Sequence, residues 1–164
     1  MSLDRRTLLA GLALAPLAGC AGAEAPLPRT RLRAVRLDVA PLVEKGLPNW
    51  AAKVARLAEP RLAAAFADLL APGDAAAPVV TVSIDEIRLA STGIGIGLFG
   101  DVADEDEISG RLVVAPPRAA PVTRRLTAHR APESGPWSAP DAEDRRLADL
   151  LALWARWARR EFER

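Results

Sequence analysis

The sequence contains a single cysteine, Cys20, and the residues that precede it indicate the role of its thiol. It ends the run Leu-Ala-Gly-Cys at positions 17–20, directly after a short apolar segment at positions 8–17. Two arginines at positions 5 and 6 come first, giving the positive start, apolar core and small final residues that are typical of a secretory signal. The core is too short to span a bilayer, which needs about 20 apolar residues. We therefore expect this segment to be processed and not to belong to the fold.

The same pattern resembles the lipobox of bacterial lipoprotein signal peptides. In that family the peptide is cut just before the cysteine and the thiol is diacylated, which implies cleavage between Gly19 and Cys20 and a diacylglycerol- and palmitate-bearing Cys20. A buried methylene contributes about 0.8 kcal/mol, so several acyl chains would make a stable anchor. The alternative is an ordinary secretory signal cut elsewhere, with Cys20 incidental. The arginine pair also looks like a twin-arginine export motif, so both export routes stay open.

Nucleophilic catalysis would have to use the one histidine, His129. With one histidine and no second cysteine, a histidine-rich zinc site and a cysteine–histidine dyad are excluded by count. A serine–histidine–acid triad remains arithmetically open, but no serine lies in the glycine-any-serine-any-glycine pattern of a nucleophile elbow. We expect His129 at a solvent-facing or edge position of a strand, and no enzyme activity. The serines considered for a triad include Ser83, Ser91, Ser109, Ser134 and Ser138.

The glycine-rich segment at positions 95–100 has the letters of a dinucleotide-binding fingerprint. That fingerprint needs a helix to open at its last glycine so that backbone amides meet the pyrophosphate. Here an acidic run at positions 101–107 follows and would repel a phosphate, so we expect no cofactor. The apolar residues of the segment either continue a strand and cover the core, or form a pliable loop that contacts a membrane, a lipid or a partner. They are Ile94, Ile96, Leu98 and Phe99.

Two groups of charged residues could meet a ligand. The acidic run at positions 101–107 lacks the alternating acids, central glycine and terminal glutamate of an EF-hand loop, so we expect a solvated loop and no metal. Several arginines could touch anionic lipid headgroups if they gather on one side, whereas scattered surface arginines are the plainer alternative. They are Arg29, Arg31, Arg33, Arg36, Arg124 and Arg125.

Composition bounds the mature chain. We expect a signal peptide over residues 1–19, a small, proline-bearing lipidated tether over 20–29, and one domain over 30–164. The chain carries 22 Lys and Arg against 21 Asp and Glu, a balance that argues against a nucleic-acid partner. With Cys20 acylated no thiol remains for a disulfide, so the fold must hold by packing.

The sequence predicts a strand and a helix in the first half of the domain. Val35, Leu37 and Val39 alternate with other residues, which predicts a half-buried strand. Helical spacing of apolar residues over positions 50–57 then predicts a helix. Pro60 marks either a kink or the start of a second helix, because proline is disfavoured inside a helix but accepted in its first turn.

Three strands and a helix follow. The second strand changes phase after Ile84, and a bulge near Asp85 and Glu86 would return its later apolar residues to the buried face. The third and fourth strands, at positions 108–114 and 122–128, are close enough to form a hairpin, with Gly110 in register. A cap at Ser138 followed by an acid predicts the start of a C-terminal helix. Its apolar stripe comprises Leu147, Leu150, Leu151, Trp154, Trp157, Ala158 and Phe162.

This order predicts an α+β domain: a small four-stranded sheet with two main helices on one face, in the order β-α-β-β-β-α. With the lipobox, it is similar in plan to the lipopolysaccharide-assembly lipoprotein and to the auxiliary lipoproteins of phospholipid-trafficking ABC systems. That resemblance implies a non-enzymatic accessory subunit of an envelope transport or assembly complex, whose partners are the membrane, through Cys20, and envelope proteins. The alternative is a free-standing structural or stress-related envelope lipoprotein. Ala21 follows Cys20, where aspartate would favour inner-membrane retention, so we expect the outer membrane.

Overall fold

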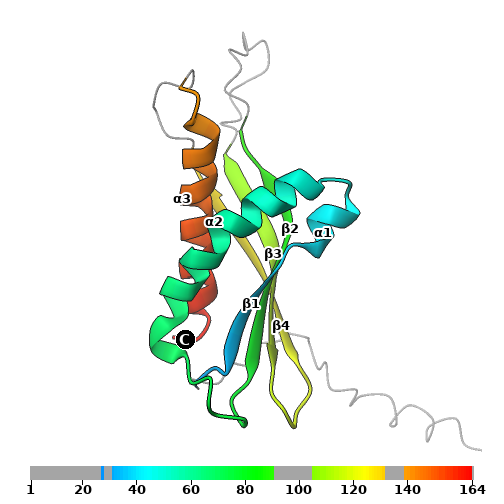
Figure 1. The fold of residues 1–164 in the computed structure, drawn as a ribbon, viewed down its shortest axis with the longest axis vertical. Helices are drawn as coiled ribbons and strands as arrows, with labels where there is room; N and C mark the ends of the chain where they lie inside the picture. Colours follow the sequence, from blue (N-terminus) through cyan, green and yellow to red (C-terminus); the bar gives the residue numbers. More distant parts are fainter. Residues whose placement is uncertain (1–26, 28–30, 91–104, 132–138, 164) are drawn as a thin grey trace, which may run out of the picture.

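The computed structural model describes residues 27, 31–90, 105–131 and 139–163, which form one α+β domain (Figure 1). This confirms the fold class that the sequence predicts. The short helix α1 departs from the sequence prediction, in which Pro41 only ends the first strand. The elements in chain order are β1 (Ala34–Asp38), α1 (Ala40–Glu44), α2 (Pro48–Phe66), the 3-10 turn η1 (Ala67–Leu69), β2 (Val79–Arg88), β3 (Asp106–Ala115), β4 (Val122–Arg130) and α3 (Ala142–Arg160).

The sheet has the strand order β1-β2-β3-β4, so β1 and β4 are its edges. β1 pairs parallel with β2, while β2, β3 and β4 pair antiparallel. α2 and α3 both lie on one face of the sheet, and no other described helix covers the opposite face (Figure 1). We call the first the helix face and the second the open face. The hairpin and the placement of both main helices on one face agree with the sequence prediction.

The predicted bulge in β2 is confirmed. The pairing of β2 with β3 shifts between Ile84 and Glu86, so Asp85 is the extra residue. The bulge pushes the backbone of β2 toward Gly110, where a Cβ atom would lie 2.0 Å from the carbonyl oxygen of Ser83. A glycine is therefore required at position 110, which explains why a residue without a side chain stands in an apolar row of β3.

Both main helices depart from the sequence prediction in detail. α2 runs through Pro60 without starting a second helix, because Pro60 and Arg56, whose carbonyl loses its hydrogen bond, are exposed to water. α3 begins at Ala142, and its N-cap residue Asp141 makes no side-chain capping bond. The expected cap, Ser138, lies outside the described residues, so the structure gives α3 a later start than the sequence suggests.

The core lies between the helix face of the sheet and the two long helices. Trp154 is its largest fully buried side chain, and Phe66 meets Phe162 edge-on with ring centroids 5.7 Å apart. Six of the seven predicted stripe residues of α3 are buried, but Trp157 is 38% exposed, so its assignment to the core was wrong. Leu27, from the stretch assigned to the tether, is also buried in this core. The ordered domain therefore takes up part of the expected tether.

Candidate functional site

The residues singled out by the sequence as sites fall mostly outside the described part of the chain. Gly19 and Cys20 lie there, as do the four apolar residues of the glycine-rich segment, Ile94, Ile96, Leu98 and Phe99. Their lipid-attachment and contact roles stay predictions. The structure does describe the residues that flank positions 91–104 and the point where the chain enters the domain.

The point where the chain enters the domain and the residues that flank positions 91–104 lie at opposite ends of the sheet. Ala34, at the start of β1, is level with Val79, at the start of β2. β2 then runs for ten residues, about 30 Å at roughly 3.3 Å per residue, before Ala90. The tether therefore enters at one end of the sheet, which we call the tether end, and positions 91–104 leave from the other, the distal end.

A buried ion pair closes the distal end. Asp106, at the start of β3, is 1% exposed, and its carboxylate accepts hydrogen bonds from the backbone N–H of Ala90 (2.9 Å) and from Nε of Arg146 (3.1 Å). The Nη2 atom of Arg146 also contacts this carboxylate and donates to the carbonyl oxygen of Ala90 at 2.9 Å. We call Ala90, Asp106 and Arg146 the clasp. It joins β2, β3 and α3 at the base of positions 91–104.

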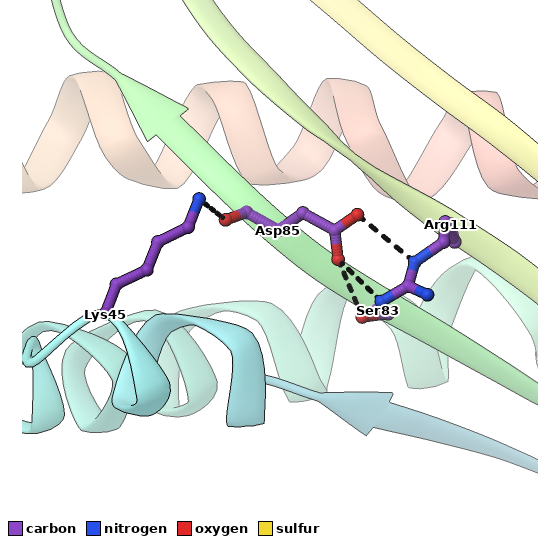
Figure 2. A network of polar contacts seen from close by, with 4 residues as sticks. All are labelled: Lys45, Ser83, Asp85 and Arg111. Carbon is purple, nitrogen blue, oxygen red and sulfur yellow. Dashed lines mark hydrogen bonds and ion pairs between the residues drawn. The ribbon is translucent and has the colours of Figure 1, made fainter.

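A second polar cluster lies at the bulge on the open face, and Figure 2 shows it with Asp85 in the middle. Arg111 holds the Asp85 carboxylate with two nitrogens, Nε and Nη2, each at 3.2 Å, and the Ser83 hydroxyl lies 3.2 Å from the same carboxylate. From the other side of β2, Lys45 Nζ donates to the backbone carbonyl of Asp85 at 2.8 Å. We call these four residues the bulge network. It satisfies the polar groups that the bulge takes out of the ladder.

The structure does not bring His129 together with a nucleophile in the described part of the chain. His129 is exposed on β4, and its Nδ1 atom lies 3.9 Å from Glu105 Oε2. Ser83 and Ser109 are buried, and the Ser83 hydroxyl turns to Asp85. Ser91, Ser134 and Ser138 lie outside the described residues, among which no group of three or more metal-binding side chains occurs.

The arginines considered for lipid headgroups do not gather. Arg31 and Arg33 are exposed at the tether end, and Arg36 is exposed on β1. Arg125 is exposed on the far edge strand, β4, while Arg124 is 7% exposed and turned toward the helix face. Arg29 lies outside the described residues. The described arginines thus point to several sides of the domain, and the single basic patch considered above is not formed by them.

The two edges of the sheet differ. At the start of the β1 edge, Leu32 bridges to Leu70: its N–H donates to the Leu69 oxygen (2.9 Å) and its oxygen accepts from the Ala71 N–H (2.8 Å). Past the end of β1, Lys45, the C-cap residue of α1, donates a hydrogen bond to the Asp85 carbonyl of β2. This edge is therefore short and covered at both ends, as edge strands in natural sheets usually are.

The β4 edge is long and borders a groove. β4 has nine residues and pairs on one side with β3. Beside its last residue, Arg130, a groove opens against α3, lined by Arg130, Asp149, Ala152, Leu153 and Arg156. An ion pair of 2.8 Å joins Arg130 to Asp149 across it. The exposed Trp157 lies one helical turn beyond Leu153 on the same side of α3. Sequence reasoning did not single out this surface.

These features define an α+β domain that carries two helices on one face of a four-stranded sheet, with β4 as an edge that pairs with β3 alone among the described strands. Within the described residues no helix is long and apolar enough to cross a membrane. No protein-family model matches the chain, and no curated protein matches it either. Among solved structures it is similar to a PelC dodecamer from Paraburkholderia phytofirmans that carries a point substitution, with 19% identity over 77% of this chain and 88% of that chain and a TM-score of 0.39. A likeness at this level carries no argument about function.

Proposed function

We propose that this chain is a membrane-anchored, periplasm-facing lipoprotein that works as a non-enzymatic binding or accessory subunit of an envelope transport or assembly complex. The observation that carries the proposal is the lipobox pattern at positions 17–20, ending in the only cysteine of the chain. Acylation of Cys20 would supply the anchor. The outer membrane is the proposed location, because Ala21 follows Cys20.

The burial of Leu27 supports a domain held close to the bilayer. Six residues, at positions 21–26, separate Cys20 from Leu27 in the core. Whatever path they take, they reach at most about 25 Å, since an extended chain spans about 3.3–3.6 Å per residue. The tether end of the sheet would then lie next to the membrane and the distal end would point away from it. Such a domain is suited to meeting proteins at the membrane surface.

The polar chemistry in the described part supports binding over catalysis. The Asp106 carboxylate is held by Arg146 and the Asp85 carboxylate by Arg111. Both are occupied as ion-pair partners that fix strands. The β4 edge, by contrast, offers backbone groups and a neighbouring groove on the surface.

The proposal is tested by affinity purification of the full-length protein from detergent-solubilised envelopes, with Cys20→Ala as control. We expect an intact mass that shows acyl groups on a chain starting at Cys20, recovery in the outer-membrane fraction, and stoichiometric transport or assembly subunits that are lost with Cys20→Ala. A chain without acyl groups would overturn the anchor. An acylated chain recovered alone would instead favour a free-standing envelope lipoprotein.

A further inference from the structure

We propose that the β4 edge and the adjoining side of α3 bind an extended acidic segment of a partner protein, which adds to the sheet as a fifth strand. The proposal deepens the proposed function, because it names the partner chemistry of a binding subunit. It is carried by three features of the same surface: strand backbone at an edge that no described strand pairs with, apolar side chains on the adjoining side of α3, and positive charge.

The backbone comes first. In an antiparallel pair, every second residue turns its N–H and C=O away from its neighbour, so about half of the residues of β4 present both groups at the edge. Within β4 itself, Arg124 Nη1 makes a long contact of 3.5 Å to the Thr123 oxygen. The β1 edge is by contrast only five residues long, and it is covered at both ends by the Leu70 bridge and the Lys45 contact. No described helix or strand covers the β4 edge in a comparable way.

Apolar side chains stand where one face of an added strand would lie. Leu153 is partly buried and Trp157 is 38% exposed, and both lie on the side of α3 next to β4. Side chains of a strand alternate between its two faces. Every second side chain of a fifth strand would therefore turn toward α3 and cover Leu153 and Trp157, which favours apolar residues at those positions of the partner.

The charge on the open-face side of this edge selects an acidic partner. β4 has no Asp or Glu, and Arg125 and His129 are exposed on its open-face side. On the helix side Arg124 is buried and Arg130 is paired with Asp149, so the charge that a partner meets there is balanced. Arg125 forms no ion pair with any described residue. Pairing β4 with β4 of a second copy would bring arginines together, and like charges across strands are destabilising. An extended segment that turns apolar residues toward α3 and acids toward Arg125 on the open face gains where a second copy loses.

The test uses the full-length, Cys20-acylated protein in detergent and a capped, dye-labelled eight-residue peptide that alternates Glu and Val. Anisotropy should show binding that weakens with salt. Two control peptides separate the contributions. Replacing Glu by Lys reverses the charge, and N-methylation at alternate residues, made in both registers, keeps the charge but removes the donors that face the edge. We expect the Lys peptide and only one of the two N-methylated registers to bind about tenfold or more weakly.

Protein variants locate the site. Arg125→Glu should weaken binding about tenfold, whereas Arg36→Glu, at an exposed arginine of the other edge strand, β1, should leave it unchanged. Hydrogen exchange at residues 122–130 should slow when the peptide is bound. Far-UV circular dichroism and thermal unfolding of both variants establish that they fold.

Several outcomes would overturn the proposal: equal binding of both N-methylated registers, binding unaffected by Arg125→Glu, or slowed exchange elsewhere in the chain and not at residues 122–130. Concentration-dependent dimers that protect β4 would assign the edge to a second copy instead. Failure here is distinct from failure of the proposed function, since the envelope purification scores acylation and complex formation without reference to β4. Co-purified subunits that survive Arg125→Glu would keep the accessory function and move its docking surface.

Discussion

The clasp and the bulge network each pair an aspartate of the sheet with an arginine, from α3 in the clasp and from β3 in the bulge network, and the two pairs differ in burial. In the clasp the side chains of Asp106 and Arg146 are 2% and 16% exposed. In the bulge network those of Asp85 and Arg111 are 34% and 51% exposed. A buried charge that loses its partner is costly, whereas an exposed one is solvated by water. The aspartate–arginine pair should therefore be essential for stability at the distal end and dispensable for stability on the open face.

The difference matters for the two regions that these clusters hold, the distal end and the open face. The clasp fixes the ends of β2 and β3 against α3, so positions 91–104 leave from a rigid base. The bulge network faces water on the side of the sheet that no described helix covers. The distal end is thus held by an interaction that needs both of its partners, and the open face can tolerate change.

Breaking the clasp should have the largest effect. Asp106→Ala leaves the Arg146 guanidinium and the Ala90 N–H without their common acceptor, and we expect the free energy of unfolding to fall by about 3–5 kcal/mol. Urea unfolding of the full-length protein measures it. The double variant Asp106→Ala with Arg146→Met should regain part of the loss, because it removes the unpaired charge. A double variant as unstable as the sum of both single changes would contradict this account.

Filling the bulge site should come next. The Cβ atom of Gly110→Ala would lie 2.0 Å from the Ser83 oxygen, so the backbone of β2 or β3 must move. We expect a loss of about 3 kcal/mol, at the upper end of overpacking effects, and a change in the bulge network that this backbone carries. Gly73→Ala, at a position where a Cβ meets nothing within 4 Å, is the control and should be nearly neutral. Equal melting temperatures for the two variants would refute a steric role of the bulge.

The sequence predicted the layers of this fold because periodicity records which face is buried. Alternation in the strands and the stripe of α3 depend on local spacing alone, and even the bulge was visible as a change of phase after Ile84. The departures come from tertiary context. Trp157 has the spacing of a core residue, but it lies at the side of α3 next to an edge strand, where none of the other described strands covers it. Pro60 is tolerated inside α2 because its side faces water.

The clasp was not predicted, since its partners are 40 residues apart and Asp106 lies in an acidic run that suggested solvated charge throughout. One observation could have found it. Asp106 is in phase with Ile108 and Leu112, so alternation turns it toward the helix face, where a carboxylate needs a partner. The same reasoning applies to Arg124, which is in phase with Leu126 and Ala128 and is buried with them. The β4 edge could not be predicted, because strand order is set by pairings that one sequence does not reveal.

The counterpart of Asp106→Ala is removal of the exposed carboxylate of the bulge network, Asp85. Asp85→Ala deletes the contacts to Arg111 and to the Ser83 hydroxyl but leaves the Lys45 bond, which uses the backbone carbonyl. Exposed ion pairs contribute about 0–1 kcal/mol, so we expect the free energy of unfolding to fall by no more than about 1 kcal/mol. A loss as large as that of Asp106→Ala, measured in the same urea titration, would mean that burial is not what separates the two sites.

The smallest effect should come from the exposed pair that joins η1 to α3 near the tether end, Asp68 and Arg159, 2.9 Å apart. The hydrogen bond from Arg159 lowers the pKa of Asp68 below its usual 3.8. Because the folded-state pKa lies below the unfolded one, this pair adds stability above pH 3.8 that is lost as the pH falls through the folded pKa. Arg159→Gln should return the carboxyl pKa toward 3.8 in a nuclear magnetic resonance titration, and its stability should converge with that of the parent in acid. Arg160→Gln, at the exposed neighbouring position, should shift neither quantity. If Arg159→Gln lowered stability equally at all pH values, the arginine would act through packing of its aliphatic stem and not through charge.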